Sequence, residues 1–217
     1  NAHHVSDSNA IIYSSYEIIY NGLVSKGSQA SEDALDLLKI FSFFHRQHIR
    51  VGILVRAASN PKLERQEQER RELVEKKIKR KPKSLAQVIK SVGLDFVIFL
   101  LKLGSRPVLP RVLRDADESG SFDEFRLREA LRELHQMSLI FYIPEDDSYS
   151  MHPVLHLWVR ERPEMSIAEQ AVWCQATATI LTQSILLPPL DDTEEGEIFR
   201  RDLIPHVDHV QKCERAI

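Results

Sequence analysis

The stretch that decides the fold is SFDEFRLREALRELHQMSLIFYIPEDDSYSMHP, residues 121–153. Its first half carries apolar residues at helical intervals of three and four: Leu127, Ala130, Leu131, Leu134 and Met137. This pattern predicts an amphipathic helix with one buried face. We expect Ser121 to cap the helix and Glu124, three residues later, to complete a capping box.

The second half of this stretch predicts a β-hairpin. Residues 139–143 (LIFYI) are of types enriched in strands, residues 144–148 (PEDDS) form a turn cluster, and residues 149–151 (YSM) supply the returning strand. A helix that runs directly into a hairpin is typical of the second half of a winged-helix domain.

Upstream, residues 31–59 (SEDALDLLKIFSFFHRQHIRVGILVRAAS) predict two helices that meet at the polar break HRQH, residues 45–48. Ser31 is the expected N-cap of the first helix, which is apolar on more than one face and is therefore expected to be buried on most sides. The second helix is expected to begin at about Ile49. Helix-turn-helix, third helix and hairpin together predict a winged-helix domain over residues 31–163, preceded by an N-terminal linker or helix over residues 1–30.

A charged helical insertion interrupts this domain at about residues 60–113. Between residues 61 and 83 there are ten basic residues and five glutamates. Several glutamates stand four residues before a basic residue, which favours a solvated helix. The alternative is a surface for an anionic partner such as RNA, DNA or acidic lipid. Residues 84–113 return to apolar character, as expected of a core helix followed by a proline-marked connection.

The last part of the chain, residues 164–217, predicts two more helices. Ser166 and Glu169 form a capping box. The apolar stripe of the first helix is Ile167, Ala171, Cys174, Ala178, Leu181 and Ile185. The stripe of the second is Phe199, Leu203, His206, Val207, Val210 and Cys213. We expect an α-helical, TPR-like hairpin, the start of a repeat region.

Composition narrows the function classes. The 217 residues are 43% hydrophobic and 28% charged, with seven glycines and a net charge of −3, which indicates a mainly α-helical globular chain. No apolar run approaches the roughly 20 residues that span a bilayer, no secretion signal opens the sequence, and two cysteines make no disulfide framework. A cytoplasmic protein without a membrane anchor is expected. Phosphate-binding glycine motifs and a nucleophile elbow are also absent from the sequence, so we expect no enzyme and no catalytic residue.

Two patterns in the sequence resemble metal sites but are incomplete. Residues 115–126 resemble a calcium loop, but Arg126 stands at position twelve, where a bidentate glutamate is needed. The pairs His152/His156 and His206/His209 have helical ligand spacing but no diagnostic carboxylate or cysteine partner, so no metal site is expected.

Nucleic-acid binding was weighed on the helix within residues 121–138. Its basic residues Arg126, Arg128 and Arg132 could face a major groove. The interspersed glutamates (124, 129 and 133) weaken such a footprint, so nucleic acid is an unlikely partner.

His152 is the one candidate binding residue. Proline is favoured at the first helical position, so Pro153 predicts that a helix begins there and leaves His152 at its N-cap. Backbone N–H groups and the positive end of the helix dipole gather at that point, where an imidazole could join them around a phosphate. The alternative is that His152 only connects the hairpin to the helix.

Six stretches together resemble the winged-helix part of fungal NOD-like receptors of the NB-ARC/TPR type. In chain order they are SSYEIIYNGL, ALDLLKIFSFFHRQHI, ILVRAAS, FRLREALRELHQMSLIFYI, SMHPVLHLWVRER and FRRDLIPHVDHV. The resemblance covers most of the chain outside the charged insertion. It implies a non-catalytic module of a STAND-class signalling ATPase, placed after a nucleotide-binding domain and before a repeat array.

The resemblance also implies a role for His152. The Met-His-Asp motif of related plant receptors falls on Met151, His152 and Pro153, so His152 is expected to touch the β-phosphate of ADP. ADP or ATP is expected only together with the upstream nucleotide-binding domain. The module would relay nucleotide state to oligomerisation in innate-immunity signalling, with that domain and the downstream repeats as partners. The alternative is a winged-helix nucleic-acid-binding protein that uses its basic insertion.

Overall fold

A computed structural model describes residues 2–61, 63, 70, 109–114, 122–185 and 194–217, with the backbone alone for residues 2–11. The chain divides into two units, residues 1–60 with 109–217, and residues 61–108. Most of the predicted insertion at 60–113 lies outside the described residues, as do residues 115–121 of the calcium-like stretch 115–126. The following account concerns the first unit.

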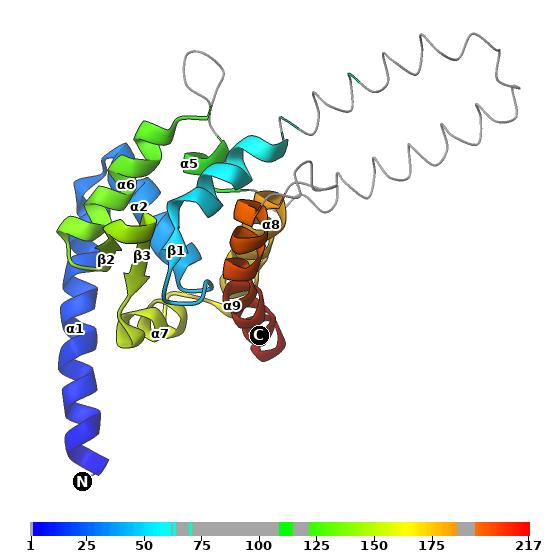
Figure 1. Cartoon of the computed structure of the whole chain (residues 1–217). Helices are drawn as coiled ribbons and strands as arrows, with labels where there is room; N and C mark the ends of the chain where they lie inside the picture. The colour runs from blue at the N-terminus through cyan, green and yellow to red at the C-terminus, as the bar shows by residue number, and fades with distance from the viewer. Residues whose placement is uncertain (1, 62, 64–69, 71–108, 115–121, 186–193) are drawn as a thin grey trace, which may run out of the picture. The chain divides into compact units, whose positions relative to one another are not determined.

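This unit is mainly helical, with one small antiparallel sheet (Figure 1). Its helices are α1 (Ala2–Lys26), α2 (Gln29–Phe41), a helix over residues 51–61, α5 (Arg111–Arg114), α6 (Glu124–Gln136), the 3-10 turn η1 (Pro144–Asp146), α7 (Pro153–Glu161), α8 (Ile167–Ser184) and α9 (Glu194–Ala216). The strands are β1 (Ile49–Arg50), β2 (Ile140–Ile143) and β3 (Ser148–Met151).

The predicted hairpin is present, and it carries a third strand that the sequence did not indicate. β2 pairs with β3, and β3 pairs on its other side with β1, in the order β1-β3-β2. Ile49 was expected to open a helix, but it lies opposite Tyr149 in extended conformation. His48, at a φ of 55°, turns the chain into this strand, and the helix begins at residue 51.

Two helix starts differ from the prediction. Ser28, three residues before Ser31, is the N-cap of α2, and Ser31 is buried at the third helical position, where it completes the capping box. Asp123 is the N-cap of α6, and its side chain accepts the N–H of Arg126. Glu124 is therefore the first helical residue and no capping-box partner. In both cases the sequence offers neighbouring polar residues, and local pattern does not decide among them.

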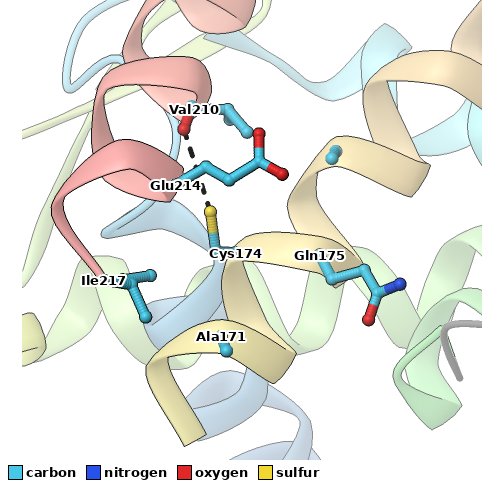
Figure 2. A pocket seen from close by; sticks show the side chains of 7 residues that line it. Ala171, Cys174, Gln175, Val210, Glu214 and Ile217 are labelled. Atoms are coloured by element: carbon cyan, nitrogen blue, oxygen red, sulfur yellow. Dashed lines mark hydrogen bonds between the residues drawn. The ribbon is translucent and has the colours of Figure 1, made fainter. Parts of the chain in front are cut away.

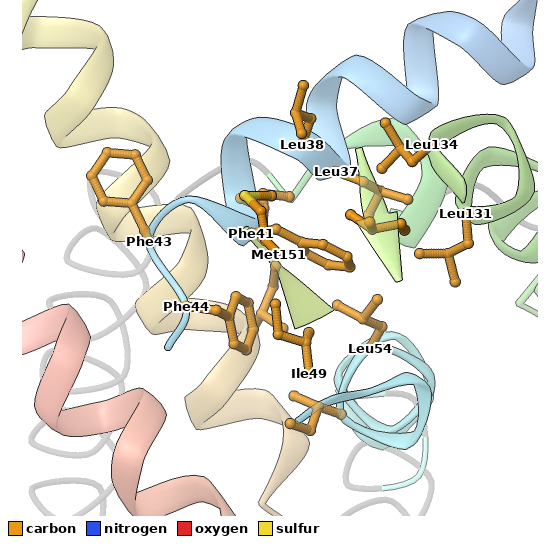
Figure 3. Packing of buried hydrophobic residues seen from close by; sticks show 14 of the residues in the cluster. Leu37, Leu38, Phe41, Phe43, Phe44, Ile49, Leu54, Leu131, Leu134 and Met151 are labelled. Atoms are coloured by element: carbon orange, nitrogen blue, oxygen red, sulfur yellow. The ribbon is translucent and has the colours of Figure 1, made fainter. Parts of the chain in front are cut away.

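The core forms around α2, as its apolar faces predicted. α2 packs most extensively against α6 and also contacts α1, α7 and α8. Figure 3 shows Leu37 and Phe41 of α2 near Met151, with Leu131 and Leu134 of α6 in the same core cluster. The predicted stripe of α6 is buried as expected, apart from Met137, which is partly exposed at the C-cap.

The helices α8 and α9 form an antiparallel pair that packs on this core. The capping box at Ser166 and Glu169 is confirmed. The predicted stripe of α8 is wrong at its N-terminal end, because Ile167 is 68% exposed, whereas Cys174 and Leu181 are buried. α8 contacts α2 on one side and α9 on the other, so its buried surface is wider than one stripe. In α9, Val207 is 36% exposed and the rest of the predicted stripe is at least partly buried.

Candidate functional site

His152 lies where strand β3 meets helix α7, as predicted. It is the N-cap of α7, with Pro153 at the first helical position. Its Nδ1 accepts a 3.2 Å hydrogen bond from the N–H of Val154. Because Nδ1 acts as an acceptor, the proton of the neutral ring is on Nε2. The side chain is exposed, so this site presents one imidazole N–H donor to a binding partner.

The backbone on both sides of His152 is held firmly. The N–H of Met151 donates to the carbonyl of Arg46 at 2.8 Å, and the carbonyl of His152 accepts the first helical hydrogen bond, from the N–H of His156, at 2.9 Å. Met151 is buried. The imidazole therefore stands on a fixed support, with the backbone of a cationic residue, Arg46, beside it.

Fewer backbone N–H groups are available to an anion beside His152 than the sequence predicted for a helix N-terminus. Pro153 has no N–H, and the N–H of Val154 is already bonded to the imidazole itself. An anion at this point would be met chiefly by Nε2–H of His152. Sequence reasoning placed the residue correctly but could not show that its ring would use one of those donors.

The histidine pairs weighed as metal ligands do not converge. His156 is 5% exposed, and its Nε2–H donates to the carbonyl of Phe44 at 2.8 Å, whereas His152 points to solvent. In the part of the chain that the structure describes, no group of three or more histidine, cysteine, aspartate or glutamate side chains is arranged to hold a metal ion. Asp123 and Arg126 of the calcium-like stretch serve helix α6 instead.

Two of the three arginines that could face DNA are engaged by carboxylates. Arg126 bonds to the buried Asp33. Arg128 bonds to Glu124 at 2.9 Å and to Asp147 at 3.2 Å, and these hydrogen bonds raise its pKa further above the usual range. A nucleic-acid surface on α6 would have to break these pairs.

A cavity of about 310 Å³ opens between α8 and α9 (Figure 2). It is lined mainly by small and apolar side chains, with Gln175 and Glu214 as its polar members: Ala171, Cys174, Gln175, Ala178, Val210, Glu214 and Ile217. Burial raises the pKa of the Cys174 thiol to about 11, and its Sγ lies 3.8 Å from the carbonyl of Val210. A protonated thiol is a poor nucleophile, so this cavity offers no reactive group.

Among the described residues, none of the helices combines the length and the apolar character that a membrane crossing requires. No protein-family model matches this chain, and the searches of curated proteins and of solved structures found no match either. The functional interpretation therefore depends on the residues and on the geometry of the site.

Proposed function

We propose that this chain is a non-catalytic regulatory module of a STAND-class signalling ATPase of the NOD-like receptor type. It would act in the cytoplasm, between an upstream nucleotide-binding domain and downstream helical repeats. The order of its elements supports this proposal. A helix pair (α2 and residues 51–61), a third helix (α6) and a hairpin (β2 and β3) follow one another as in a winged helix, and α8 and α9 follow as a helical hairpin.

The observation that carries the proposal is the exposed imidazole of His152 on a rigid helix start. Its Nε2–H is free to donate to a phosphate oxygen of ADP held by the neighbouring domain. A hydrogen bond to a charged group contributes about 1.5–3 kcal/mol. That is enough to shift a two-state equilibrium roughly tenfold or more, but not enough to bind a nucleotide alone.

The mechanism is a switch between two arrangements. With ADP present, His152 helps to hold this module against the nucleotide-binding domain. Exchange for ATP removes that contact, so the modules separate and surfaces for oligomerisation become accessible. His152 carries out no chemistry in either state, and the isolated chain should not bind ADP.

The test uses the full-length receptor that carries this chain. Sequencing the parent gene upstream of Asn1 should reveal a phosphate-binding loop of the Walker A type. His152→Ala should then raise spontaneous signalling, because the ADP-bound arrangement loses a contact. His135→Ala, at an exposed histidine on α6, is the matched control and should leave signalling unchanged. Normal signalling by His152→Ala would contradict the proposal.

The local excess of basic residues at 61–83 favours a second candidate, a winged-helix nucleic-acid-binding protein. Binding through this segment would be electrostatic and would weaken steeply with salt. A mobility shift with duplex DNA at low salt would support this candidate, and the absence of a shift there would remove it.

A further inference from the structure

Four histidines from three segments meet where α9 packs on the body of the unit. His45 belongs to the loop between α2 and β1, His156 to α7, and His206 and His209 to α9. The ring centroid of His45 lies 6.2 Å from that of His206 and 6.4 Å from that of His209. The ring centroids of His156 and His209 are 5.1 Å apart. This histidine cluster joins α9 to the loop and to α7.

His206 is held in its neutral form by its surroundings. It is 1% exposed, and its ring meets Phe44 edge to face at 5.2 Å. Its Nε2–H donates to the carbonyl of His48 at 3.2 Å. Its Nδ1 is buried, and no described residue is hydrogen-bonded to it. A second proton on this ring would place a cationic N–H where it meets no acceptor, which is costly in a dry interior.

His209 is held neutral in a different way. Arg160 Nη1 lies 2.9 Å from its Nε2 and 3.1 Å from Sγ of Cys213. A guanidinium can only donate, so Nε2 of His209 must be an unprotonated acceptor. Protonation of that nitrogen would set two donors against each other and break the link between α7 and α9.

Burial and the neighbouring positive charges lower the pKa values of three histidines in the cluster. Burial lowers the pKa of His156 to about 3, with Arg160 and the neighbouring imidazoles adding to the effect. Burial also lowers the pKa of His206 to about 4 and that of His209 to about 4, with Arg160 and Lys212 adding to the shift of His209. The neighbouring imidazoles of His45 and His209 also lower the pKa of His206, whereas its hydrogen bond to the carbonyl of His48 opposes the shift. On α9, the carboxylate of Asp202 is paired with Arg50 of β1 at 2.8 Å.

We propose that the histidine cluster is an acid-sensitive latch that fastens α9 to α7 and to the loop at residues 42–48. At neutral pH the uncharged rings of His156, His206 and His209 hold α7, α9 and the loop together. A charged ring beside Arg160 would lose the bond between Arg160 and His209, so in mild acid protons bind to the open arrangement of α9 and draw the equilibrium toward it. α9 is then released before the core around α2 unfolds. This input is separate from the nucleotide contact at His152.

Release of α9 should be local because its neighbours have attachments without histidines. Thr177 of α8 is buried, and its hydroxyl donates to the carbonyl of Ile40 in α2 at 3.3 Å. The packing of α2 against α6 contains no histidine of the cluster.

The test is hydrogen exchange by mass spectrometry on the 217-residue chain at pH 7.5 and pH 5.5, with rates corrected for the intrinsic effect of pH. One histidine that titrates only in the open state makes opening about tenfold more favourable at one unit below its free pKa. We expect protection of α9 to fall at least tenfold at pH 5.5 and to stay weaker than that of α2 and α6, because those two helices open only when the whole unit unfolds. Equal protection of α2 and α9 at both pH values, or no loss in α9, would overturn the latch.

Two variants separate titration from packing. In His206→Gln/His209→Gln the amides still offer hydrogen bonds but cannot take up a proton, so the pH-dependent part of the loss in α9 should shrink to a few-fold. His135→Gln changes a histidine outside the cluster and should behave like the original chain. If the double variant kept the full pH dependence, other groups would be responsible. The wild-type comparison of α9 with α2 still decides the matter if the double variant does not fold.

Discussion

The guanidinium of Arg126 makes two hydrogen bonds to the carboxylate of Asp33, at 2.6 Å from Nε and 2.9 Å from Nη2. Asp33 is 2% exposed and lies on α2, and Arg126 lies on α6. This forked pair connects the two helices that pack most extensively in the unit. A bidentate geometry with a buried carboxylate fixes the register of one helix against the other.

Removal of the carboxylate should destabilise the unit strongly. Asp33→Ala leaves a partly buried guanidinium without this partner, which costs about 3 kcal/mol. Urea unfolding followed by circular dichroism measures the difference. Lys26→Ala is the control. The side chains of Lys26 and its partner Glu133 are 40% and 23% exposed, so this ion pair should contribute less than about 1 kcal/mol. Similar losses in the two variants would mean that Asp33 is not a special contact.

Acid should weaken the folded state through the buried histidines. The pKa of His156 is about 3 and that of His206 about 4, against 6.5 in the unfolded chain. Below pH 6.5 the unfolded chain therefore binds more protons, so stability is full above that pH and is lost as the pH falls toward 4. Two such protons give a slope of up to about 3 kcal/mol per pH unit. Urea midpoints at pH 7.5, 6.5 and 5.5 check this slope, and a flat profile would contradict it.

Arg162 should anchor helix α1. Its side chain is 6% exposed, stacks on the ring of Tyr20 at 3.7 Å and pairs with Glu17 of α1 at 3.1 Å. Arg162→Ala removes both contacts and should cost about 2 kcal/mol, with faster hydrogen exchange in α1. Arg128→Ala, at an exposed ion pair, should cost less than about 1 kcal/mol and leave α1 unchanged. Unchanged exchange in α1 of Arg162→Ala would refute the anchor.

The capping and signalling roles of His152 can be separated. His152→Ala removes the side-chain acceptor for Val154 N–H and should lower stability by about 1 kcal/mol. His152→Asp restores a favoured N-cap without a side-chain donor, so its stability should stay within about 0.5 kcal/mol of the original. Both variants lack the imidazole Nε2–H, so both should raise spontaneous signalling in the receptor. Activation by the alanine variant alone would point to helix stability instead of phosphate contact.

The parts of the fold that were predicted correctly depend on neighbouring residues. The stripe of α6, the hairpin and the start of α7 at Pro153 follow from periodicity, turn chemistry and the fixed φ of proline. β1 was missed because a strand of two residues exists only through its pairing with Tyr149 and Ser148, about a hundred residues later. Element boundaries at Ser28 and Asp123 were missed by one turn or less.

The candidate site divides in the same way. The position of His152 could be predicted because Pro153 marks the start of a helix. Its exposure agrees with a binding role, which stays a prediction. The histidine cluster could not be predicted from the sequence, because only the tertiary fold brings residues 45, 156, 206 and 209 together. The helical spacing of His206 and His209 was the available signal, and it was weighed only for zinc.

The pairing of α2 with α6 has a consequence for biosynthesis. These helices are separated by 82 residues of sequence, including the whole second unit. At roughly 5–20 residues per second, α2 leaves the ribosome several seconds before its main partner exists. During that interval the apolar faces around Phe41 have no permanent cover, and a nascent chain in this state is a natural client for chaperones.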